Sequence, residues 1–151
     1  EIDPSFRHYA ADGLPTVISE AAKVKVLVGN YAGKFSPVIT HTPMFYYDIE
    51  LLPGEAFILP VQDEHTAALY LISGQLSVLG NTIKERQLVN FEQNGSQVAI
   101  IANEAARFIF FVGEPIKEKV VSYGPFVMNS MEAIETKIKA YQDGEMGVLE
   151  Y

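Results

Sequence analysis

Three histidines are the side chains best suited to acid–base or metal chemistry, because imidazole titrates near neutral pH and binds first-row metals. They are His8, His41 and His65. They are widely spaced, so a shared site would require three separate segments to converge. We therefore interpret all three as surface or rim residues with ordinary hydrogen bonds. The alternative is a metal site that combines His65 with Glu64 or Asp63 and with His41.

Other reactive groups give weaker signals. The sequence contains no cysteine, which excludes disulfides, thiolate metal ligands and a cysteine nucleophile. Ser73, Ser96 and Ser122 lack the Gly-x-Ser-x-Gly pattern of a nucleophile elbow. Asp48 and Glu50 could act as paired carboxylates, but their alternation along a predicted strand favours two solvated side chains. No catalytic residue and no cofactor-binding residue is therefore assigned.

Composition predicts one globular domain without a nucleic-acid-binding surface. The chain has 151 residues, of which 48% are hydrophobic, enough to form a core. The formal net charge is -8, whereas DNA or RNA binding requires a basic surface. No apolar run approaches the ~20 residues that span a bilayer, and the N-terminus lacks a signal-peptide pattern. We expect a cytoplasmic protein that binds neither nucleic acid nor membrane.

Most of the chain is expected to form short strands. Apolar or alternating segments are separated by Gly, Pro and Asn, a pattern typical of a β-sandwich or jelly roll. The predicted strands are 23–28, 44–52, 56–59, 67–72, 75–79, 88–91, 97–101 and 107–112. Ser73-Gly74 predicts a hairpin between the fourth and fifth strands, and Gly80-Asn81 predicts a second turn. The last strand is almost wholly apolar and is interpreted as buried on both faces.

Three segments are expected to lie outside this strand pattern. Residues 1–22 show no sustained period and are interpreted as a linker or surface arm with one short turn near 17–22. The polar residues 61–65 predict a rim loop. The segment 123–129 is interpreted as a packed connection, because Pro125 cannot donate to a ladder.

One α-helix is predicted, over residues 132–143. Its apolar face consists of Ile134, Ile138 and Tyr141. Asn129 or Ser130 would cap its first turn, and Gly144 lies just past its end. We expect this face to dock on the outside of the β-framework, where burial contributes ~1.5–3 kcal/mol for each side chain.

The late part of the sequence carries a distinctive run. Gly113-Glu114-Pro115 is followed by Tyr-Gly-Pro-Phe-Val-Met-Asn-Ser at 123–130. This pattern resembles the closing signature of the pirin family, whose members have two tandem cupin domains, with the signature in the second. The run Tyr-Leu-Ile-Ser-Gly at 70–74 agrees in order, and the resemblance extends over about residues 24–147. Lys119 and Met146 depart from the family, at positions without a chemical role.

The resemblance implies a fold and a place in a longer protein. The fold would be mainly β, a cupin or jelly-roll β-barrel (double-stranded β-helix) over residues 23–151, with the C-terminal α-helix packed outside. Residues 1–22 would precede it as an N-terminal arm. The sequence begins with Glu1, and segment 2–9 corresponds in the family to the crossing between two cupin halves. We therefore expect this chain to be the second half of a pirin-like protein.

The resemblance also implies that this half lacks the family's metal. Metal-bearing cupins use two histidines and a carboxylate from one hairpin and a further histidine from a later strand. Alignment on the 70–74 turn places Pro60, Gln62 and Thr66 at the first three positions and Val98 near the fourth. None of these side chains is a good ligand for a divalent first-row ion. No metal ligand is therefore assigned, and iron or a similar ion is expected only in a pirin-like N-terminal half.

Three functions stay open at this point. The first is a non-catalytic domain that packs against a metal-bearing N-terminal cupin half. The resemblance then implies that the whole protein is an iron-dependent, quercetin-2,3-dioxygenase-like enzyme or a redox-sensitive regulator. The second is a small-molecule or protein-binding cupin module, which could form a homodimer when isolated. The third is an independent metal-dependent enzyme that uses His41 and His65.

Overall fold

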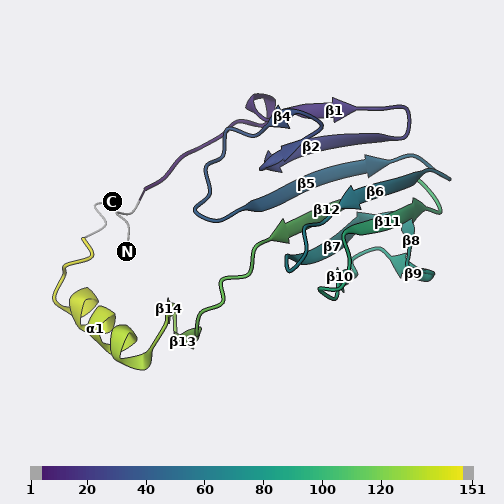
Figure 1. Cartoon of the computed structure of the whole chain (residues 1–151). Coiled ribbons are helices and arrows are strands. Elements are labelled where there is room, and N and C mark those ends of the chain that lie inside the picture. Colours follow the sequence, from purple (N-terminus) through teal and green to yellow (C-terminus); the bar gives the residue numbers. More distant parts are fainter. Residues whose placement is uncertain (1–4, 148–151) are drawn as a thin grey trace. The chain divides into compact units, whose positions relative to one another are not determined.

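The computed structural model describes residues 5–147 of the chain. The chain has two compact units, Glu1–Pro115 and Ile116–Tyr151 (Figure 1). In the described part of the first unit, the regular structure is β-strand apart from a 3-10 turn at Ala11–Gly13. The second contains a short hairpin and the α-helix.

A six-stranded antiparallel sheet forms one layer of the first unit (Figure 1). Its strands, in spatial order, are β1 (Thr16–Ile18), β2 (Ala22–Val28), β5 (Met44–Leu51), β12 (Ala106–Gly113), β7 (Thr66–Ser73) and β10 (Leu88–Asn90). Strand β12 lies in the middle and pairs with both β5 and β7. The final strand of the unit therefore joins segments that come much earlier in the chain.

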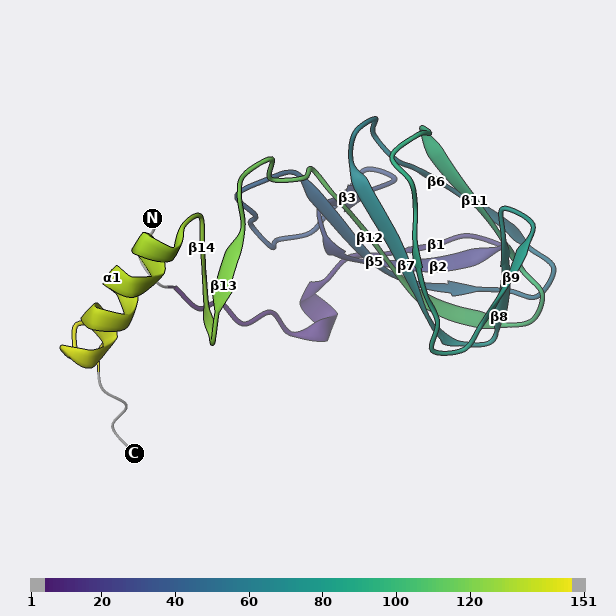
Figure 2. The same ribbon diagram turned by 90° about the horizontal axis from the view of Figure 1, so that it is seen from below.

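A four-stranded antiparallel sheet forms the second layer, seen beside the first in Figure 2. Its strands, in spatial order, are β6 (Ala56–Pro60), β11 (Gln97–Ala102), β8 (Gln75–Val78) and β9 (Asn81–Lys84). A separate two-stranded ribbon is formed by β3 (Asn30–Tyr31) and β4 (Lys34–Phe35). Each predicted strand overlaps an observed one, because period-two alternation identifies half-buried strands well.

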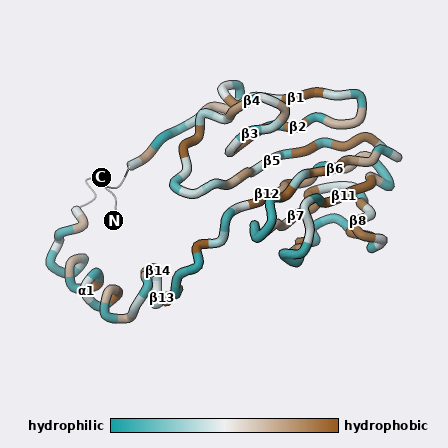
Figure 3. The backbone as a smooth tube through the Cα atoms, viewed as in Figure 1, coloured by the Kyte–Doolittle hydropathy of each residue, from teal (hydrophilic) through white to brown (hydrophobic). Residues whose placement is uncertain are grey.

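The core lies between the two sheets. Alternate residues of each strand point inward, and strands of both sheets contribute to one buried cluster. The largest fully buried side chains include Phe108, Phe110, Ile49, Leu59 and Ile100. Each contributes about 1.5–3 kcal/mol through burial. The brown, hydrophobic stretches of β11 and β12 in Figure 3 mark this core. The predicted class, mainly β with a cupin-type arrangement and one C-terminal helix, is confirmed.

Strand β12 differs from its prediction in one respect. Phe108 and Phe110 are buried, but Ile109 and Phe111 on the other face are only half-buried. The six-stranded sheet therefore has an inner face in the core and an outer face that carries large apolar groups. The prediction of burial on both faces was wrong because a continuous apolar run does not show what covers each face.

The predicted hairpin at Ser73-Gly74 does not form. Strand β7 belongs to the six-stranded sheet and β8 to the four-stranded sheet, so the chain crosses between layers at this point. Gly74 has φ +86°, and a Cβ there would lie 2.3 Å from the carbonyl oxygen of Ala105. Glycine is thus required by a close backbone approach in addition to a positive φ. The second predicted turn is confirmed, since Leu79 and Gly80 both have positive φ between β8 and β9.

Strand β1 lies within the segment that was predicted to be a linker. Val17 pairs with Val24 of β2, and Ser19 and Ala22 exchange hydrogen bonds in the turn between the two strands. A three-residue edge strand is too short to show a period in the sequence. The short turn predicted near 17–22 coincides with the connection between β1 and β2.

The second unit begins with a hairpin of β13 (Val121–Tyr123) and β14 (Phe126–Met128). The segment 123–129, interpreted as a packed connection, contains the turn and the second strand of this hairpin and belongs to neither large sheet. Gly124 has φ +56° and Pro125 follows it, which are the two central positions of a type II′ turn. Pro125 occupies the second central position, where the turn requires a negative φ such as the proline ring imposes. Its missing N–H does not weaken the hairpin, because Pro125 is not one of the paired residues.

The helix α1 spans Met131–Gln142 and packs on this hairpin. Ser130 is the N-cap, because its Oγ accepts a hydrogen bond of 3.1 Å from the N–H of Ala133. Ile134 is fully buried, whereas Tyr141, predicted to share its face, is 66% exposed. Docking of the helix on the β-framework stays a prediction. Within residues 5–147, no helix has the length and apolar character needed to cross a bilayer.

Candidate functional site

A cavity of about 590 Å³ opens in the first unit. Its wall combines Ala67 and Val89 from the six-stranded sheet with Val78, Ile83 and Val98 from the four-stranded sheet. The loops 61–65 and 91–96 complete it, together with Gln97 at the start of β11. These apolar residues face the core side of their strands, so the cavity continues the space between the two sheets. A pocket of this volume is within the range of small-molecule sites, about 300–1,000 Å³.

His65 is the buried polar residue of this wall. Its side chain lines the cavity and is 8% exposed, and its Nδ1 has no hydrogen-bond partner within residues 5–147. A buried polar atom without a partner costs about 1–3 kcal/mol. The prediction that all three histidines are surface or rim residues with ordinary hydrogen bonds was therefore wrong for His65. His8 and His41 are exposed, as expected.

A tight turn holds His65 in this position. The backbone N–H of His65 donates to the carbonyl oxygen of Gln62 at 3.1 Å, and Glu64 between them has φ +67°. A left-handed φ in a residue with a Cβ costs free energy. The amide nitrogen of Gln93 donates to the carbonyl oxygen of Glu64 at 3.1 Å and to Thr66 Oγ1 at 3.0 Å. Gln93 thereby fastens the 91–96 loop to the turn that carries His65.

The four positions aligned with metal ligands do not converge. Val98 lines this first cavity, whereas Pro60 and Gln62 line a second one. Thr66 lines neither cavity. Strand alternation gives the reason, because β6 exposes Pro60 and β7 exposes Thr66, while Val98 of β11 faces the core. The inward-facing residue of β7 is Ala67, one position beyond the aligned threonine.

The second cavity, of about 450 Å³, is lined by aromatic residues that include Tyr31, Phe45 and Tyr47. The Tyr47 hydroxyl donates to the carbonyl oxygen of Asn30 at 2.6 Å. Burial, with a smaller contribution from Tyr31, raises the pKa of Tyr47 to about 12. Burial also raises the pKa of Tyr31. At neutral pH Tyr47 is therefore a protonated hydrogen-bond donor that fixes the β3–β4 ribbon to β5.

The residues of the two cavities do not fit a divalent metal. Only His65 and Glu92 among the lining residues carry side chains that bind such ions well, and catalytic sites usually supply three protein ligands. Within the described residues, no three His, Cys, Asp or Glu side chains are grouped so that they could hold an ion. His41 lines neither cavity, so the two candidate histidines share no site. The expected absence of metal from this half stays a prediction.

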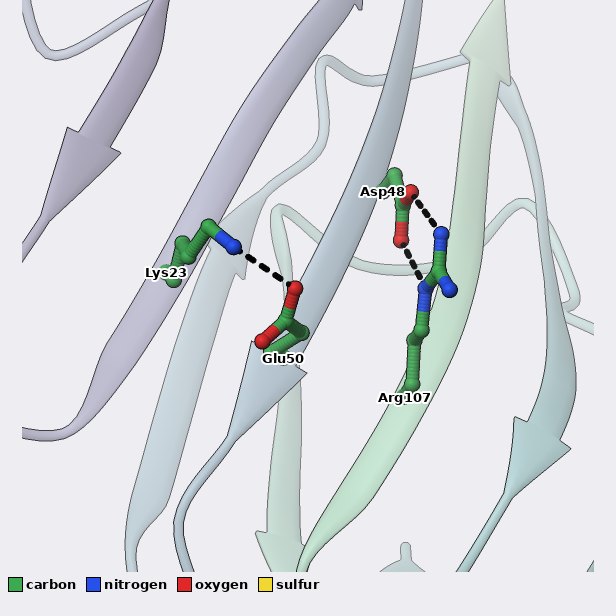
Figure 4. A network of polar contacts seen from close by, with 4 residues as sticks. All are labelled: Lys23, Asp48, Glu50 and Arg107. Carbon is green, nitrogen blue, oxygen red and sulfur yellow. Dashed lines mark hydrogen bonds and ion pairs between the residues drawn. The ribbon is translucent and has the colours of Figure 1, made fainter.

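The outer face of the six-stranded sheet has a charged half (Figure 4). Lys23 Nζ lies 2.9 Å from Glu50 Oε1, and the Arg107 guanidinium makes two hydrogen bonds with Asp48. The hydrogen bond with Asp48 is the main cause that raises the pKa of Arg107. Both carboxylates lie on the outer face of the sheet, because the inner positions of β5 hold Tyr47 and other apolar groups. The interpretation as a solvated strand residue holds for Glu50, whereas the side chain of Asp48 is mostly covered.

The rest of this face is apolar, and we refer to it as the outer apolar face. It consists of Tyr46, Tyr70, Leu88, Ile109 and Phe111. Leu88 pairs with Tyr70 and Tyr70 with Ile109, while the rings of Tyr46 and Phe111 lie 5.3 Å apart. Leu88 is 56% exposed. These residues form one continuous apolar surface across β5, β12, β7 and β10.

Two residues of the first cavity, Ala67 and Phe91, were not identified as lining residues from the sequence. Ala67 was read only as part of a strand, although its alternation with Leu69 and Leu71 indicates the inner face. Phe91 was assigned to the end of a strand, but it lines the cavity and packs against Phe110 with ring centroids 6.1 Å apart. No signal in the sequence showed that the inner faces leave an open space between them.

Comparisons with known proteins agree on one family. The family described as Pirin C-terminal cupin domain matches residues 46–147. A pirin-like protein of Solanum lycopersicum is 33% identical over 150 residues, which cover 97% of this chain and 50% of that protein. Pirin-1 of Arabidopsis thaliana is 33% identical over 152 residues, covering 96% of this chain and 53% of that protein.

A solved structure agrees as well. The crystal structure of a quercetin 2,3-dioxygenase from Acinetobacter baumannii matches with a TM-score of 0.86 and 25% identity, covering 93% of this chain and 50% of that one. The chain spans about half the length of the curated relatives it matches.

Proposed function

This chain belongs to the pirin family as a pirin C-terminal cupin domain, and from that premise we propose that it is a non-catalytic half that packs against a metal-bearing N-terminal cupin half. The whole protein would then be an iron-dependent, quercetin-2,3-dioxygenase-like enzyme. The name of the Acinetobacter baumannii relative supports this activity. A redox-sensitive regulator is the alternative role of the whole protein, and its location would be cytoplasmic.

The observation that carries this proposal is the poor set of metal ligands inside the first unit. Two good ligands, His65 and Glu92, line the first cavity, and the second cavity offers only tyrosine hydroxyls and amides. Around them stand Val61, Ala67 and Val98, which have no donor atoms. With this set of side chains, the C-terminal half would not carry out oxygen chemistry itself. The metal-bearing N-terminal half would do so, and the C-terminal half would pack against it.

The outer apolar face supports the packing role. An antiparallel sheet with one solvated face normally places polar residues on that face. Here Tyr70, Leu88, Ile109 and Phe111 occupy it instead, and a large exposed apolar surface usually marks an interface. The relatives contain a further segment of about the same length as this chain. We assign that segment as the occupant, and a second copy of this chain would take its place when the domain is isolated.

Metal analysis tests the division of roles. The longer gene product and the chain of 151 residues would be purified, reconstituted with Fe(II) and measured by plasma mass spectrometry. We expect about one equivalent in the longer protein and close to none in the chain alone. Oxygen uptake with quercetin should likewise require the longer protein. A full equivalent of tightly held iron on this chain would overturn the proposal.

Surface substitutions test the packing role separately. Leu88→Lys and Tyr70→Lys change exposed residues of the outer apolar face and should leave the Tm of this chain almost unchanged at concentrations where it is monomeric. In the longer protein they should lower Tm by several degrees, because burying a lysine at an interface is costly. Ile101→Lys is the matched control, since Ile101 is a partly exposed aliphatic residue of the other sheet. Equal effects of all three substitutions would argue against this interface.

A further inference from the structure

The loop 91–96 contains the one Asn-Gly pair of the sequence, Asn94-Gly95. In such a pair, the backbone nitrogen of the second residue can attack the side-chain amide carbon of the asparagine and close a succinimide ring. Glycine permits this attack best, because it has no Cβ to hinder the ring and adopts the backbone conformations that ring closure requires. The other asparagines precede residues with side chains, namely Tyr31, Thr82, Phe91, Glu104 and Ser130.

The structure leaves the reacting atoms of this pair accessible. Asn94 and Gly95 are both exposed and lie outside the helices and strands. The N–H of Gly95 donates no hydrogen bond within residues 5–147, so no such bond has to break before the nitrogen attacks. A Cβ built on Gly95 would meet no atom within 4 Å, so the ring has open space in which to form.

Asn129 provides an internal comparison. It is also exposed, but its Nδ2 donates to Glu118 Oε2 at 2.9 Å and to the carbonyl oxygen of Lys119 at 3.0 Å. The next residue, Ser130, is the N-cap of α1. Ring closure at Asn129 would have to break both bonds and displace the cap. The Nδ2 of Asn94, in contrast, donates only to the exposed Glu92 Oε2, at 3.0 Å.

We propose that Asn94 deamidates spontaneously through a succinimide with Gly95, and that the product loosens the loop 91–96 from the turn that carries His65. A bond forms between Gly95 N and Asn94 Cγ. The bond from Cγ to Nδ2 breaks, and the nitrogen leaves as ammonia with the proton that Gly95 gives up. Water then opens the ring to aspartate or isoaspartate, without any oxidation or reduction.

The charge of the product is the first reason for the loosening. Aspartate and isoaspartate both replace the Nδ2 donor of Asn94 by a carboxylate oxygen, so the hydrogen bond to Glu92 becomes a repulsion between like charges. Gln93 lies between these two residues in the chain. Its bonds to the Glu64 carbonyl oxygen and to Thr66 Oγ1 are the ones that hold the loop to the turn.

The backbone of the loop is the second reason. Its two ends are anchored, because the N–H of Phe91 donates to the carbonyl oxygen of Ala67 at 3.0 Å and the carbonyl oxygen of Ser96 accepts from the N–H of Val61 at 2.9 Å. Isoaspartate adds a carbon atom to the backbone between these anchors. The modification concerns this chain alone and is independent of metal binding by a preceding half.

Peptide mass spectrometry of this chain during incubation at mildly alkaline pH tests the reaction. Fragment ions should locate the change from amide to acid at Asn94, and isoaspartate methyltransferase should label part of the product. Deamidation of Asn129 should be at least roughly tenfold slower, because its two hydrogen bonds must break first. Gly95→Ala fits the open space and should slow the reaction at Asn94 at least roughly fivefold.

Hydrogen exchange tests the consequence. Asn94→Asp reproduces one product and should accelerate exchange of the amides in the turn 62–66 about fivefold, and high salt should reduce the difference. Gln93→Ala, which removes the two bonds directly, should accelerate it at least as much. Asn129→Asp adds the same charge in the second unit and should leave the turn unchanged.

Three results would each overturn the proposal. The first is deamidation of Asn94 at the rate of Asn129, and the second is an unchanged rate in Gly95→Ala. The third is unchanged exchange of the turn 62–66 both in Asn94→Asp and in aged protein whose deamidated fraction has been isolated by anion exchange.

Discussion

Arg107 of β12 and Asp48 of β5 form a bidentate ion pair. Arg107 Nε lies 2.9 Å from Asp48 Oδ1, and Nη2 lies 2.7 Å from Oδ2. The carboxylate is mostly covered, with a side chain that is 16% exposed. Parallel hydrogen bonds between a guanidinium and a carboxylate are stronger than a single contact of a lysine. The neighbouring Lys23–Glu50 pair, which is more exposed, provides an internal comparison.

A double-mutant cycle should separate these two pairs. Replacement of Arg107 and Asp48 by alanine, singly and together, should give a coupling free energy of about 1 kcal/mol. The same cycle on Lys23 and Glu50 should give about 0.5 kcal/mol or less, because exposed pairs are screened by solvent. Urea unfolding of the six variants measures both values. A coupling for Lys23–Glu50 equal to that of Arg107–Asp48 would contradict the argument from geometry.

Gly74→Ala should be among the most destabilising single-methyl additions in the first unit. The new Cβ would meet the Ala105 carbonyl oxygen and adopt a left-handed φ, so we expect a loss of about 3 kcal/mol or more in the free energy of unfolding. Gly80→Ala shares the positive φ but has open space around the added Cβ, and it should lose about 1 kcal/mol. Chemical denaturation measures the free energy of unfolding of both variants. Similar losses in Gly74→Ala and Gly80→Ala would show that the contact with Ala105 adds nothing to the cost of the positive φ.

The Tyr47 hydroxyl predicts a loss of stability at high pH. Its pKa is about 12 in the folded protein and near 10 when unfolded, so the unfolded state releases this proton first. Tyr47 therefore contributes stability that is complete below pH 10 and disappears as pH rises towards 12, a change of about 2 kcal/mol. Tyr47→Phe should cost about 1 kcal/mol at pH 7 through the lost bond to Asn30 and should flatten the decline above pH 10.

Exposed Tyr123 supplies the control for that experiment, since it is 61% exposed. Tyr123→Phe should leave the pH dependence of unfolding unchanged. Absorbance titration of the folded protein should show one fewer late-titrating tyrosine in Tyr47→Phe. If the stability of Tyr47→Phe falls above pH 10 as steeply as that of the parent protein, the ionisation of Tyr47 is not the cause.

Ser130→Ala should loosen α1 without affecting the first unit. The lost cap leaves the N–H of Ala133 without its side-chain acceptor and should cost about 1 kcal/mol locally. Hydrogen exchange of the α1 amides should therefore accelerate about fivefold, while amides of β12 keep their protection. Ser130→Asp, which retains a capping oxygen, should restore protection. Acceleration by both variants would mean that the side chain does not cap the helix.

The sequence was a good guide wherever one face of a strand is polar. Lys23 and Lys25 alternate with Val24 and Val26, and β2 appears where that pattern predicts it. The N-cap, the end of α1 just before Gly144 and the turn at Gly80 follow from local hydrogen bonding and φ, so they too were predictable. These features depend on neighbours in sequence, which a sequence displays directly.

Features that depend on distant segments were not predictable in the same way. Gly74 allows both a hairpin and a crossing between sheets, and only the approach of Ala105 distinguishes them. His65 lies in a polar run that indicates a solvated loop, yet it is buried and lines a cavity with the 91–96 loop and residues of both sheets. Alignment to a metal site likewise could not show that Thr66 points outward and Ala67 inward.

The central position of β12 has a consequence for how the chain is made. During synthesis, β5 and β7 leave the ribosome well before residues 106–113, and each then has an edge without its partner. The two edges can be joined only when the last strand arrives, so closure of this layer must wait for almost all of the first unit. Folding of nascent chains should therefore occur late and in one step, and shorter nascent chains should remain accessible to chaperones.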